Sequence, residues 1–261
     1  MIAIRTGREI EILRQANQIV ARVHAELAAI IKPGITTAAI DQRAEEIIRQ
    51  HGATPSFLGY RGFPASSCIS VEEVVVHGIP GSRVLREGQI VSVDIGVCYQ
   101  GYYGDAAVTL PCGEIDPARR RLLDTTERAL ARAIMAAKAG NTVRDIGRAV
   151  ERTCTKAGYS VVRDFVGHGI GTQMHEEPQI PNFDSGNRGP KLHPGMVLAI
   201  EPMVNMGTYR VKVLKDGWTA VTADHKPSAH FEHSVVVRED GGEVLSYLPG
   251  FTWGLDPGPD E

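Results

Sequence analysis

The chain has 261 residues and a formal net charge of −3, with 28 lysine and arginine residues against 31 aspartate and glutamate residues. This length is enough to bury a large core, and the balanced charge excludes the basic footprint typical of proteins that bind nucleic acid or anionic membranes. There is neither a signal-peptide apolar segment nor an apolar run approaching a membrane span. We therefore expect a cytoplasmic protein.

The cysteines do not form a recognisable framework. They are Cys68, Cys98, Cys112 and Cys154. Because no C-x-x-C spacing occurs among them, reduced thiols are expected rather than disulfides or a zinc finger.

Two amphipathic helices are predicted near the start of the chain. The first begins at the capping box Thr6-x-x-Glu9 and ends near Lys32-Pro33-Gly34. Its apolar positions are Ile10, Leu13, Ile19, Val20, Val23, Leu27, Ile30 and Ile31. The second helix should run from about Thr37 to Gln50 and be closed by Gly52. Its inward positions are Ile40, Ala44, Ile47 and Ile48.

Two further helices are predicted after residue 115. Asp116-Pro117 combines an N-cap residue with proline at the first helical position, and the helix should run to about Lys138. Thr142-x-x-Asp145 opens the next helix, which should end at Gly158.

The remaining segments predict loops and strands. Residues 54–70 are rich in glycine, proline and aromatic residues, which indicates a loop. From Val161 onward, short apolar runs are broken by turn residues, which is typical of strands and loops. Residues 254–261 are expected to be a frayed tail.

The chain also repeats itself. Lys32-x-Gly34-x-Thr36 recurs 106 residues later as Lys138-x-Gly140-x-Thr142, and each copy precedes a predicted helix. Residues 85–94, with the pattern Leu-x-x-Gly-x-Ile-Val-x-Val-Asp, recur 107 residues later at 192–201 as Leu-x-x-Gly-x-Val-Leu-x-Ile-Glu. Two copies of a helix–helix–strand unit predict an internal duplication.

The duplication predicts one domain over residues 1–261 whose two halves, about 7–110 and 115–250, pack face to face. Both halves deliver an acid at the same point, Asp94 in the first and Glu201 in the second. Because ligand sites favour such interfaces, these acids are candidate functional residues.

Residues 91–105 predict two antiparallel strands that each carry one aspartate. A turn at Tyr99-Gln100 would pair Asp94 directly with Asp105, whereas a turn at Gln100-Gly101 would make the pair diagonal. Both registers place the carboxylates on one face, with Cβ atoms roughly 5 Å or about 7–8 Å apart. Two divalent cations about 3.5–4 Å apart would fit between them. The alternative is two solvated aspartates flanking a hairpin.

Three more candidate ligands follow. Residues 165–175 carry His168 and His175 among three glycines, which argues against a helix. On a regular strand their odd separation would turn the side chains to opposite faces, so different roles are expected. Neutral imidazole is a common metal ligand. Glu232 directly precedes an apolar strand, where a buried acid needs a partner.

Eight short segments carry a resemblance to a known family. They are Cys68-Ile69-Ser70, His77-Gly78-Ile79-Pro80, Asp94-Ile95-Gly96, Gly104-Asp105, Gly167-His168-Gly169-Ile170-Gly171, His175-Glu176-Glu177-Pro178, Ile200-Glu201-Pro202 and Phe231-Glu232-His233. Over about residues 3–250 the chain resembles the type I methionine aminopeptidases of the pita-bread metallopeptidase family. The resemblance implies an α+β fold of two pseudo-symmetric halves, with a central antiparallel sheet and the helices outside.

The same resemblance implies two divalent metal ions, which could be Co, Mn, Fe or Zn. Their implied ligands are Asp94, Asp105, His168, Glu201 and Glu232. Asp105 and Glu232 would bridge the two ions. Sites rich in carboxylates discriminate weakly between such metals, so the sequence does not select one.

The subtype follows from spacing. Only 25 residues lie between His175 and Glu201, too few for the helical insertion of type II enzymes. The chain has no Cys/His-rich N-terminal extension, as in the short bacterial form. Phe57 and Met174 depart from the Cys and Phe usual in bacterial relatives, and His230 replaces a usual Gln.

The resemblance implies hydrolytic removal of the initiator methionine from nascent polypeptides. The metal pair would lower the pKa of a water molecule, with Glu201 as both ligand and proton shuttle. His175 would stabilise the tetrahedral oxyanion, and His77 would hydrogen-bond the peptide beyond the scissile bond. We expect a monomer that meets nascent peptide and, transiently, the ribosome, without nucleic-acid specificity or a membrane partner.

The resemblance also implies a pocket for the methionine side chain. A thioether suits an apolar, semi-rigid pocket of aromatic rings and sulfur. The implied pocket residues are Tyr60, Phe63, Cys68, Met174 and Trp218, with Phe57 nearby. Rejection of β-branched first residues and a requirement for a small second residue are expected.

Two other functions share these features. Prolidases and aminopeptidase P have the same ligands and fold but generally carry an extra N-terminal domain, whereas this chain begins a few residues before its first predicted helix. A catalytically inactive peptide- or ribosome-binding relative is the non-enzyme alternative. Such relatives usually lose ligands, and here all five are present, together with both accessory histidines.

Overall fold

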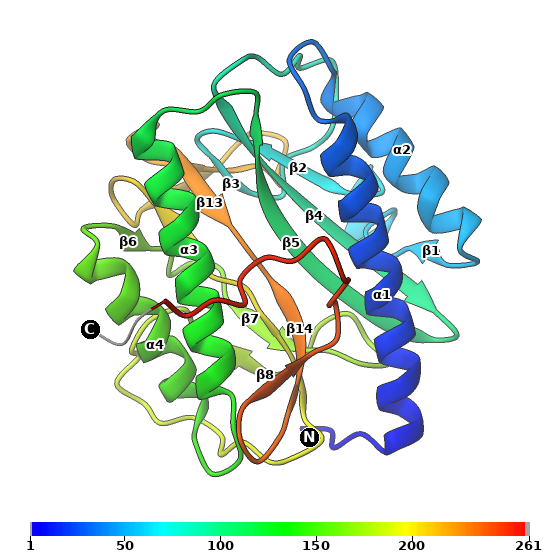
Figure 1. Ribbon diagram of the computed structural model, residues 1–261, viewed down its shortest axis with the longest axis vertical. Helices are drawn as coiled ribbons and strands as arrows, with labels where there is room; N and C mark the ends of the chain where they lie inside the picture. The colour runs from blue at the N-terminus through cyan, green and yellow to red at the C-terminus, as the bar shows by residue number, and fades with distance from the viewer. Residues whose placement is uncertain (1, 259–261) are drawn as a thin grey trace.

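The computed structural model describes residues 2–258, and over these residues helices pack on antiparallel β-sheets (Figure 1). The helices are α1 (Gly7–Ile30), α2 (Thr37–Gln50), α3 (Pro117–Ala136) and α4 (Val143–Lys156), with a short 3-10 turn at Tyr60–Gly62. The first strands are β1 (Thr54–Pro55), β2 (Cys68–Val71), β3 (Val74–Val76), β4 (Gln89–Tyr99), β5 (Tyr102–Cys112), β6 (Ser160–Val161) and β7 (Gly167–Gly169). The others are β8 (Glu176–Ile180), β9 (Val197–Ile200), β10 (Met203–Asn205), β11 (Val211–Val213), β12 (Ala220–Thr222), β13 (Ser228–His230), β14 (His233–Val237) and β15 (Gly242–Val244).

The four helices begin where the sequence predicts. At the start of α1, the amide of Thr6 donates to the Glu9 carboxylate at 2.8 Å and the amide of Glu9 donates to the Thr6 hydroxyl at 3.3 Å, which completes the capping box. Thr142 and Asp145 cap α4 in the same way. The bounds of α2 agree with the prediction, and the left-handed φ of 71° at Gly52 follows its end.

Two predicted segments differ in detail. Residues 54–70 are not wholly a loop, because β1 and the start of β2 pair with β4 there. The expected frayed tail is also wrong up to Pro257. The amide of Gly254 donates to Glu127 on α3 at 3.3 Å, and the guanidinium of Arg132 donates to the Pro257 carbonyl at 3.0 Å. These bonds hold the segment against the helix; residues 259–261 lie outside the described range.

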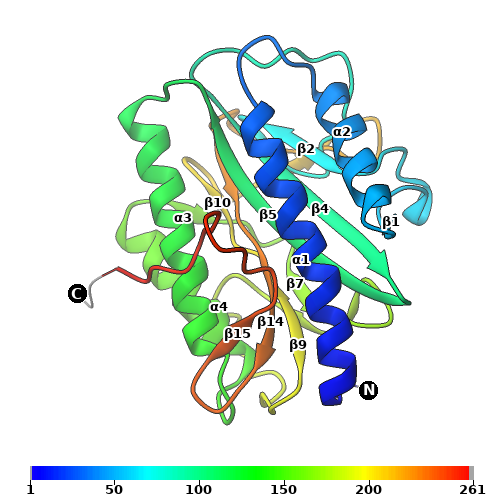
Figure 2. The same cartoon turned by 45° about the vertical axis from the view of Figure 1, so that its right-hand side comes forward.

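The first half is organised around a long strand pair. β4 and β5 pair without interruption from Gln89 opposite Cys112 to Tyr99 opposite Tyr102. Gln100 and Gly101 form the turn, both with left-handed φ angles, 51° and 80°. Of the two registers that the sequence allowed, this is the one that places Asp94 and Asp105 diagonally. α1 packs along the pair, and α2 lies beside α1 (Figure 2).

The second half holds shorter strands. Its main sheet has the order β15-β14-β9-β7-β8, and α3 and α4 pack together on the outer side (Figure 1). The halves are joined by hydrogen bonds across the seam between β5 and the start of β14. The amide of Glu232 donates to the Ala107 carbonyl, and the hydroxyl of Ser234 donates to the Asp105 carbonyl, both at 2.8 Å. Residues on both sides of this seam therefore meet in one place.

Within residues 2–258, no helix combines the length and the apolar character that crossing a membrane would require.

Candidate metal centre and active site

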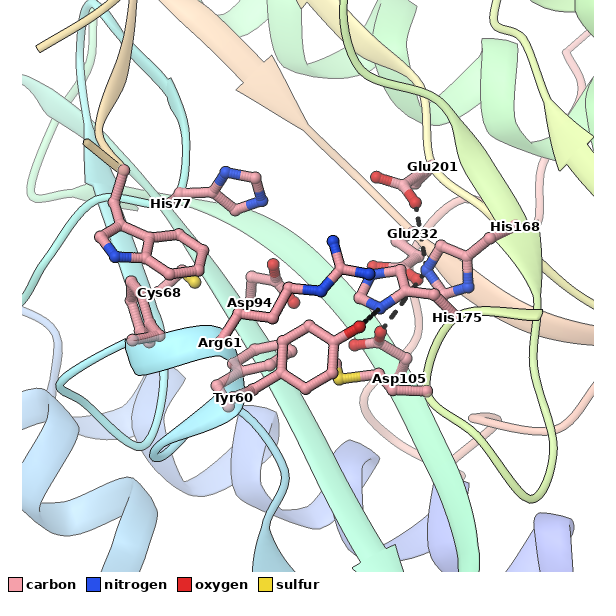
Figure 3. A pocket seen from close by; sticks show the side chains of 14 residues that line it. Tyr60, Arg61, Cys68, His77, Asp94, Asp105, His168, His175, Glu201 and Glu232 are labelled. Carbon is pink, nitrogen blue, oxygen red and sulfur yellow. Dashed lines mark hydrogen bonds and ion pairs between the residues drawn. The ribbon is translucent and has the colours of Figure 1, made fainter.

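A cavity of about 170 Å³ lies where the two halves meet (Figure 3). It collects residues that the sequence analysis assigned to metal binding, catalysis and the methionine pocket. Its lining consists of Phe57, Tyr60, Arg61, Phe63, Cys68, His77, Asp94, Asp105, His168, Met174, His175, Glu201, Trp218 and Glu232. His230 is not part of the lining, but its Nε2 lies 3.7 Å from a carboxylate oxygen of Glu201. The predicted site is thus assembled, and Arg61 is an addition that the sequence analysis missed.

Four carboxylates form one side of the cavity. Asp94 and Asp105 come from the paired strands β4 and β5. Glu201 follows the last residue of β9 and Glu232 precedes the first residue of β14, and those strands end at the pair Ile200 and His233. The two glutamates therefore occupy the next opposed positions of that strand pair. Each half contributes two acids from one antiparallel pair.

His168 completes this cluster from β7. Its Nε2 lies 3.5 Å from a Glu201 oxygen and 3.9 Å from an Asp105 oxygen. Its Nδ1–H donates to the carbonyl of Gly169 at 3.0 Å, so the Nε2 lone pair faces the acids. Burial lowers the pKa of His168 to about 3, and the ring is neutral at pH 7. Ligand atoms of Asp105, His168 and Glu232 lie within 4.8 Å of one another.

The chemistry of this donor set fits divalent cations. One oxygen each of Asp94, Asp105 and Glu232 is buried without a hydrogen-bond partner. Burial raises the pKa of Asp94 to about 7, and burial with the neighbouring carboxylates raises the pKa values of Asp105 and Glu232 well above their usual range. Four acids cannot all remain charged here without positive charge between them. Carboxylate oxygens with one imidazole are suitable ligands for such cations.

The second predicted histidine lies beside the first. The ring centroids of His168 and His175 are 4.3 Å apart. The expectation that they would face opposite sides is wrong, because β7 ends at Gly169 and the chain turns before His175. The hydroxyl of Tyr60 lies 2.8 Å from Nδ1 of His175. When this hydroxyl donates, His175 carries its proton on Nε2 and can donate it to a bound substrate.

The other side of the cavity is apolar. Phe57, Phe63, Cys68 and Met174 form a buried cluster, and partly buried Tyr60 and Trp218 pack against it. Phe63 meets Trp218 edge to face, with ring centroids 5.2 Å apart. A Cβ atom on Gly96 would lie 2.8 Å from the Phe57 ring and 3.0 Å from the Met174 methyl group, so a side chain at Gly96 would fill the space they occupy.

His77 borders this apolar side. Its ring packs against Trp218, with centroids 6.1 Å apart, and against Phe165, at 5.3 Å. Burial, with the nearby His175, lowers the pKa of His77 to about 4. The neutral ring is held in a left-handed backbone conformation with φ 59°. Such strained positions are common at functional sites.

A buried polar layer behind the acids was missed by the sequence analysis. His24 on α1 donates from Nε2 to the Val93 carbonyl at 3.1 Å, next to Asp94. The Trp253 indole N–H donates to the Glu232 carbonyl at 3.3 Å, and its ring meets His24 edge to face, with centroids 5.2 Å apart. The only sequence signal was a histidine on the apolar face of a helix. Nothing local marks Trp253, which lies just before the predicted tail.

The chain is similar to known metallopeptidases. The model of metallopeptidase family M24 matches residues 11–239. A methionine aminopeptidase of Bacillus subtilis is 50% identical over 246 residues, which cover 94% of this chain and 99% of that protein. The crystal structure of a methionine aminopeptidase from Thermotoga maritima superposes with a TM-score of 0.92 at 44% identity, covering 94% of this chain and 99% of the other.

The chain belongs to metallopeptidase family M24 and has the pita-bread fold of that family. Within the family, it groups with the type I methionine aminopeptidases, to which its sequence is about half identical along nearly the whole chain. A prolidase from Pyrococcus furiosus also superposes, with a TM-score of 0.76, but at 24% identity and over 65% of its own length. That likeness shows the shared fold alone.

Proposed function

We propose that this protein hydrolyses the bond after an N-terminal methionine in polypeptides whose second residue is small. The observation that carries this proposal is the joining of two features in one cavity. An apolar pocket of suitable size for a thioether lies directly against a buried cluster of four acids and one histidine. The pocket would select the side chain, and the cluster would hold the ions that hydrolysis needs.

The proposed metal centre holds two divalent ions. Asp94, Asp105, His168, Glu201 and Glu232 would hold these ions, with Asp105 and Glu232 contributing to both sites. When bound, such ions would polarise the scissile carbonyl and lower the pKa of a water molecule towards neutrality. The unpartnered buried oxygens of Asp94, Asp105 and Glu232 support this assignment.

The protein's own side chains would move the proton and stabilise charge. Glu201 would accept a proton from the attacking water and transfer it to the departing amine, while the new C–O bond forms and the C–N bond breaks. In the metal-free protein, burial and the nearby Asp94 raise the pKa of Glu201 well above its usual range. His175 would donate from Nε2 to the developing oxyanion. His77 would hydrogen-bond the peptide beyond the scissile bond.

Specificity would follow from the cavity walls. Phe57, Phe63 and Trp218 are rigid rings, and Cys68 and Met174 supply sulfur, which makes favourable contacts with a thioether. A β-branched side chain has extra bulk at its first carbon, and we propose that these rings exclude it. We propose that the second substrate residue lies near His77 and His175, which line the same cavity, and that only small residues fit there. Each additional methylene discriminates by about 1–3 kcal/mol.

The test compares peptides in the presence and absence of metal. Met-Ala-Ser should be cleaved after reconstitution with a divalent metal and left intact after chelation, while X-Pro dipeptides should be poor substrates. Preferred cleavage of X-Pro would favour a prolidase or aminopeptidase P. Absence of metal-dependent cleavage with every peptide would favour a binding module. Comparable rates for Met-Lys and Met-Ala, or for Ile-Ala and Met-Ala, would contradict the proposed pocket.

We further propose that the site lies within one catalytic domain built by duplication, with halves of about 7–110 and 115–250. The corresponding positions of Asp94 and Glu201 in the sequence repeat support this origin, with Asp94 inside β4 and Glu201 directly after β9. We propose that the enzyme is a cytoplasmic monomer that acts on nascent peptide and meets the ribosome transiently. The metal would be Co, Mn, Fe or Zn.

A further inference from the structure

The active-site cavity continues into a second, larger space, which we call the outer groove. The outer groove has a volume of about 720 Å³ and shares three lining residues, Arg61, His168 and His175, with the active-site cavity. Its other walls include Arg5 near the N-terminus and Glu177 on β8, the edge strand of the five-stranded sheet. The two spaces therefore meet beside the proposed catalytic histidine.

The two spaces differ in volume and in lining. The active-site cavity, at about 170 Å³, is the smaller of the two spaces and is the one that contains the proposed metal ligands. His175 and Arg61 are exposed at the junction of the two spaces. The chain that follows the scissile bond must leave the closed cavity, and an extended polypeptide advances about 3.3–3.6 Å per residue. Because the outer groove shares Arg61 and His175 with the cavity, residues that follow the scissile bond can enter it.

Some charged side chains of the outer groove are paired with an opposite charge and others are not. Arg5 is paired with Glu176, so these two charges offset each other. Among residues 2–258, Arg61 and Glu177 have no oppositely charged side chain within ion-pair distance. Arg61 borders both spaces, whereas Glu177 borders only the outer groove. The positive charge is therefore the one nearer the scissile bond.

The backbone around Arg61 presents this side chain to the junction. Gly59, Arg61 and Gly62 have φ angles of 81°, 49° and 88°, and such left-handed angles are uncommon for a residue other than glycine. The guanidinium lies 5.4 Å from the centroid of the Tyr60 ring, and Tyr60 in turn bonds His175. Figure 3 shows the Arg61 side chain extending across the cavity towards His175. Its position is thus tied to the catalytic side of the cavity.

We propose that the outer groove binds the substrate polypeptide beyond its second residue, and that Arg61 gives the enzyme a preference for an acidic third residue. This inference rests on the proposed function, because it concerns the same substrates. A carboxylate on the third residue would meet an unneutralised guanidinium, the geometry that arginine favours for carboxylates. A lysine there would meet like charge. Arg61 acts here in specificity and takes no part in bond cleavage.

The experiment uses the metal-reconstituted enzyme and three blocked peptides, Met-Ala-Glu-Leu-amide, Met-Ala-Ala-Leu-amide and Met-Ala-Lys-Leu-amide. The amide removes the terminal carboxylate, so charge differs only at the third residue. We expect kcat/KM for the glutamate peptide to exceed that for the lysine peptide by about threefold to tenfold at low ionic strength, and the ratio to fall with added salt. Arg61→Gln should bring the ratio close to one, and Arg61→Lys should restore part of it.

Arg86→Gln is the matched control, because Arg86 is exposed and borders neither space. It changes the net charge by the same amount and should leave the ratio unaltered. Equal rates for the charged peptides in the unmodified enzyme, or a ratio that persists in Arg61→Gln, would overturn this inference while leaving the proposed function intact. Failure to cleave even the alanine peptide would instead overturn the proposed function.

Discussion

Each half of the molecule contributes two acids to the cavity from one antiparallel strand pair, but the two strand pairs differ in length. In the first half, Asp94 and Asp105 lie within an uninterrupted pair of eleven-residue strands. In the second, Glu201 and Glu232 lie just beyond the paired residues of β9 and β14, which are four and five residues long. A long strand pair fixes its side chains through its own backbone. Acids at strand ends depend on neighbours to hold them.

Those neighbours are the buried side chains around Trp253. Its carbonyl accepts a hydrogen bond from Nε2 of His233 at 2.8 Å, and the hydroxyl of Ser246 lies 2.7 Å from Nδ1 of the same ring. The rings of Trp253 and His233 stack, with centroids 4.5 Å apart. Because His233 follows Glu232 directly, this arrangement fixes the backbone of a proposed metal ligand. The comparison therefore predicts that the halves respond differently to substitution.

The largest predicted effect is a difference in kcat between variants of Asp94 and Glu201, which occupy corresponding positions in the sequence repeat. Glu201→Gln should lower kcat by about 10²–10⁴ even at saturating metal, because the variant loses proton transfer as well as a ligand charge. Asp94→Asn should weaken metal binding but lose less kcat once metal is saturating. Metal content by mass spectrometry and kcat across a metal titration would measure both. Equal kcat values for the two variants at saturation would contradict a special role for Glu201.

The accessory histidines should also differ between the halves. His175→Ala should lower turnover by about 10²–10³ with metal content nearly unchanged, as for loss of an oxyanion donor. His77→Ala should cost less, because His77 positions the peptide without contacting developing charge. Tyr60→Phe is a milder test, since it removes only the bond to Nδ1 of His175. Wild-type turnover in His175→Ala would show that the assignment is wrong.

Trp253→Phe should weaken metal binding by about tenfold, at the low end for partners that orient ligands. Phenylalanine keeps a ring against His24 and His233 but removes the N–H that donates to the Glu232 carbonyl. Competition with a chromogenic chelator would measure affinity, and thermal unfolding of the metal-free protein would report stability. Phe251→Leu is the control, because Phe251 packs on Trp253 without bonding a ligand. If Phe251→Leu weakens metal binding equally, general packing is responsible.

The pH dependence of stability tests both halves at once. Burial raises the pKa of Asp94 to about 7 and those of Asp105, Glu201 and Glu232 well above their usual range. Acids with a higher pKa in the folded protein stabilise it at low pH, and this stabilisation is lost as the pH rises through the folded pKa. Buried histidines such as His168 act in the opposite sense, but only below about pH 6.5, their unfolded pKa.

Between pH 6.5 and 8.5 only the carboxylates should therefore matter. The unfolding temperature of the metal-free protein should fall by about 3 °C per pH unit for each acid that titrates, and saturating divalent metal should remove the decline. Asp94→Asn and Glu201→Gln should each make the decline shallower. Differential scanning calorimetry with and without chelator measures this. A metal-free protein that becomes more stable over this interval would contradict the raised carboxylate pKa values.

The same comparison explains what the sequence could predict. Asp94 and Asp105 are eleven residues apart in one hairpin, so alternation alone places them on one face, and only the position of the turn was undetermined. Glu201 and Glu232 meet through a pairing of distant strands, for which the sequence has no local signal; their selection came from the repeat, the apolar strand and the family resemblance. The starts of α1 and α4 were predictable for a similar reason, because a capping box is a short local sequence pattern.

The remaining features depend on long-range packing. The rings of His168 and His175 lie close together because β7 stops after three residues, and periodicity alone gave the wrong expectation. Trp253 contacts two distant segments, α1 through His24 and the start of β14 through Glu232 and His233. Arg61 acquires its place from the left-handed turn around it. Contacts of this kind are fixed by the whole fold.

The smallest predicted effect concerns the pocket that both halves share. Phe57 comes from the first half and Met174 from the second, and both occupy the space over Gly96. Cys68 is buried at 4% exposure, and burial raises the pKa of its thiol, so it reacts poorly with thiol reagents. Iodoacetamide should therefore leave the activity of the unmodified enzyme nearly intact, even if it labels the more exposed Cys98, which does not line the cavity.

Phe57→Cys should introduce sensitivity to iodoacetamide while changing kcat/KM for Met-Ala-Ser by less than about tenfold. The smaller side chain removes one wall, but the rings of Phe63 and Trp218 remain to confine the methionine. Rejection of Ile-Ala should persist for the same reason. Mass spectrometry would locate the labelled cysteine, and residual activity would be followed over time. Rapid inactivation of the unmodified enzyme with label on Cys68 would show that the pocket thiol is accessible, and that Phe57 does not shield this wall of the site.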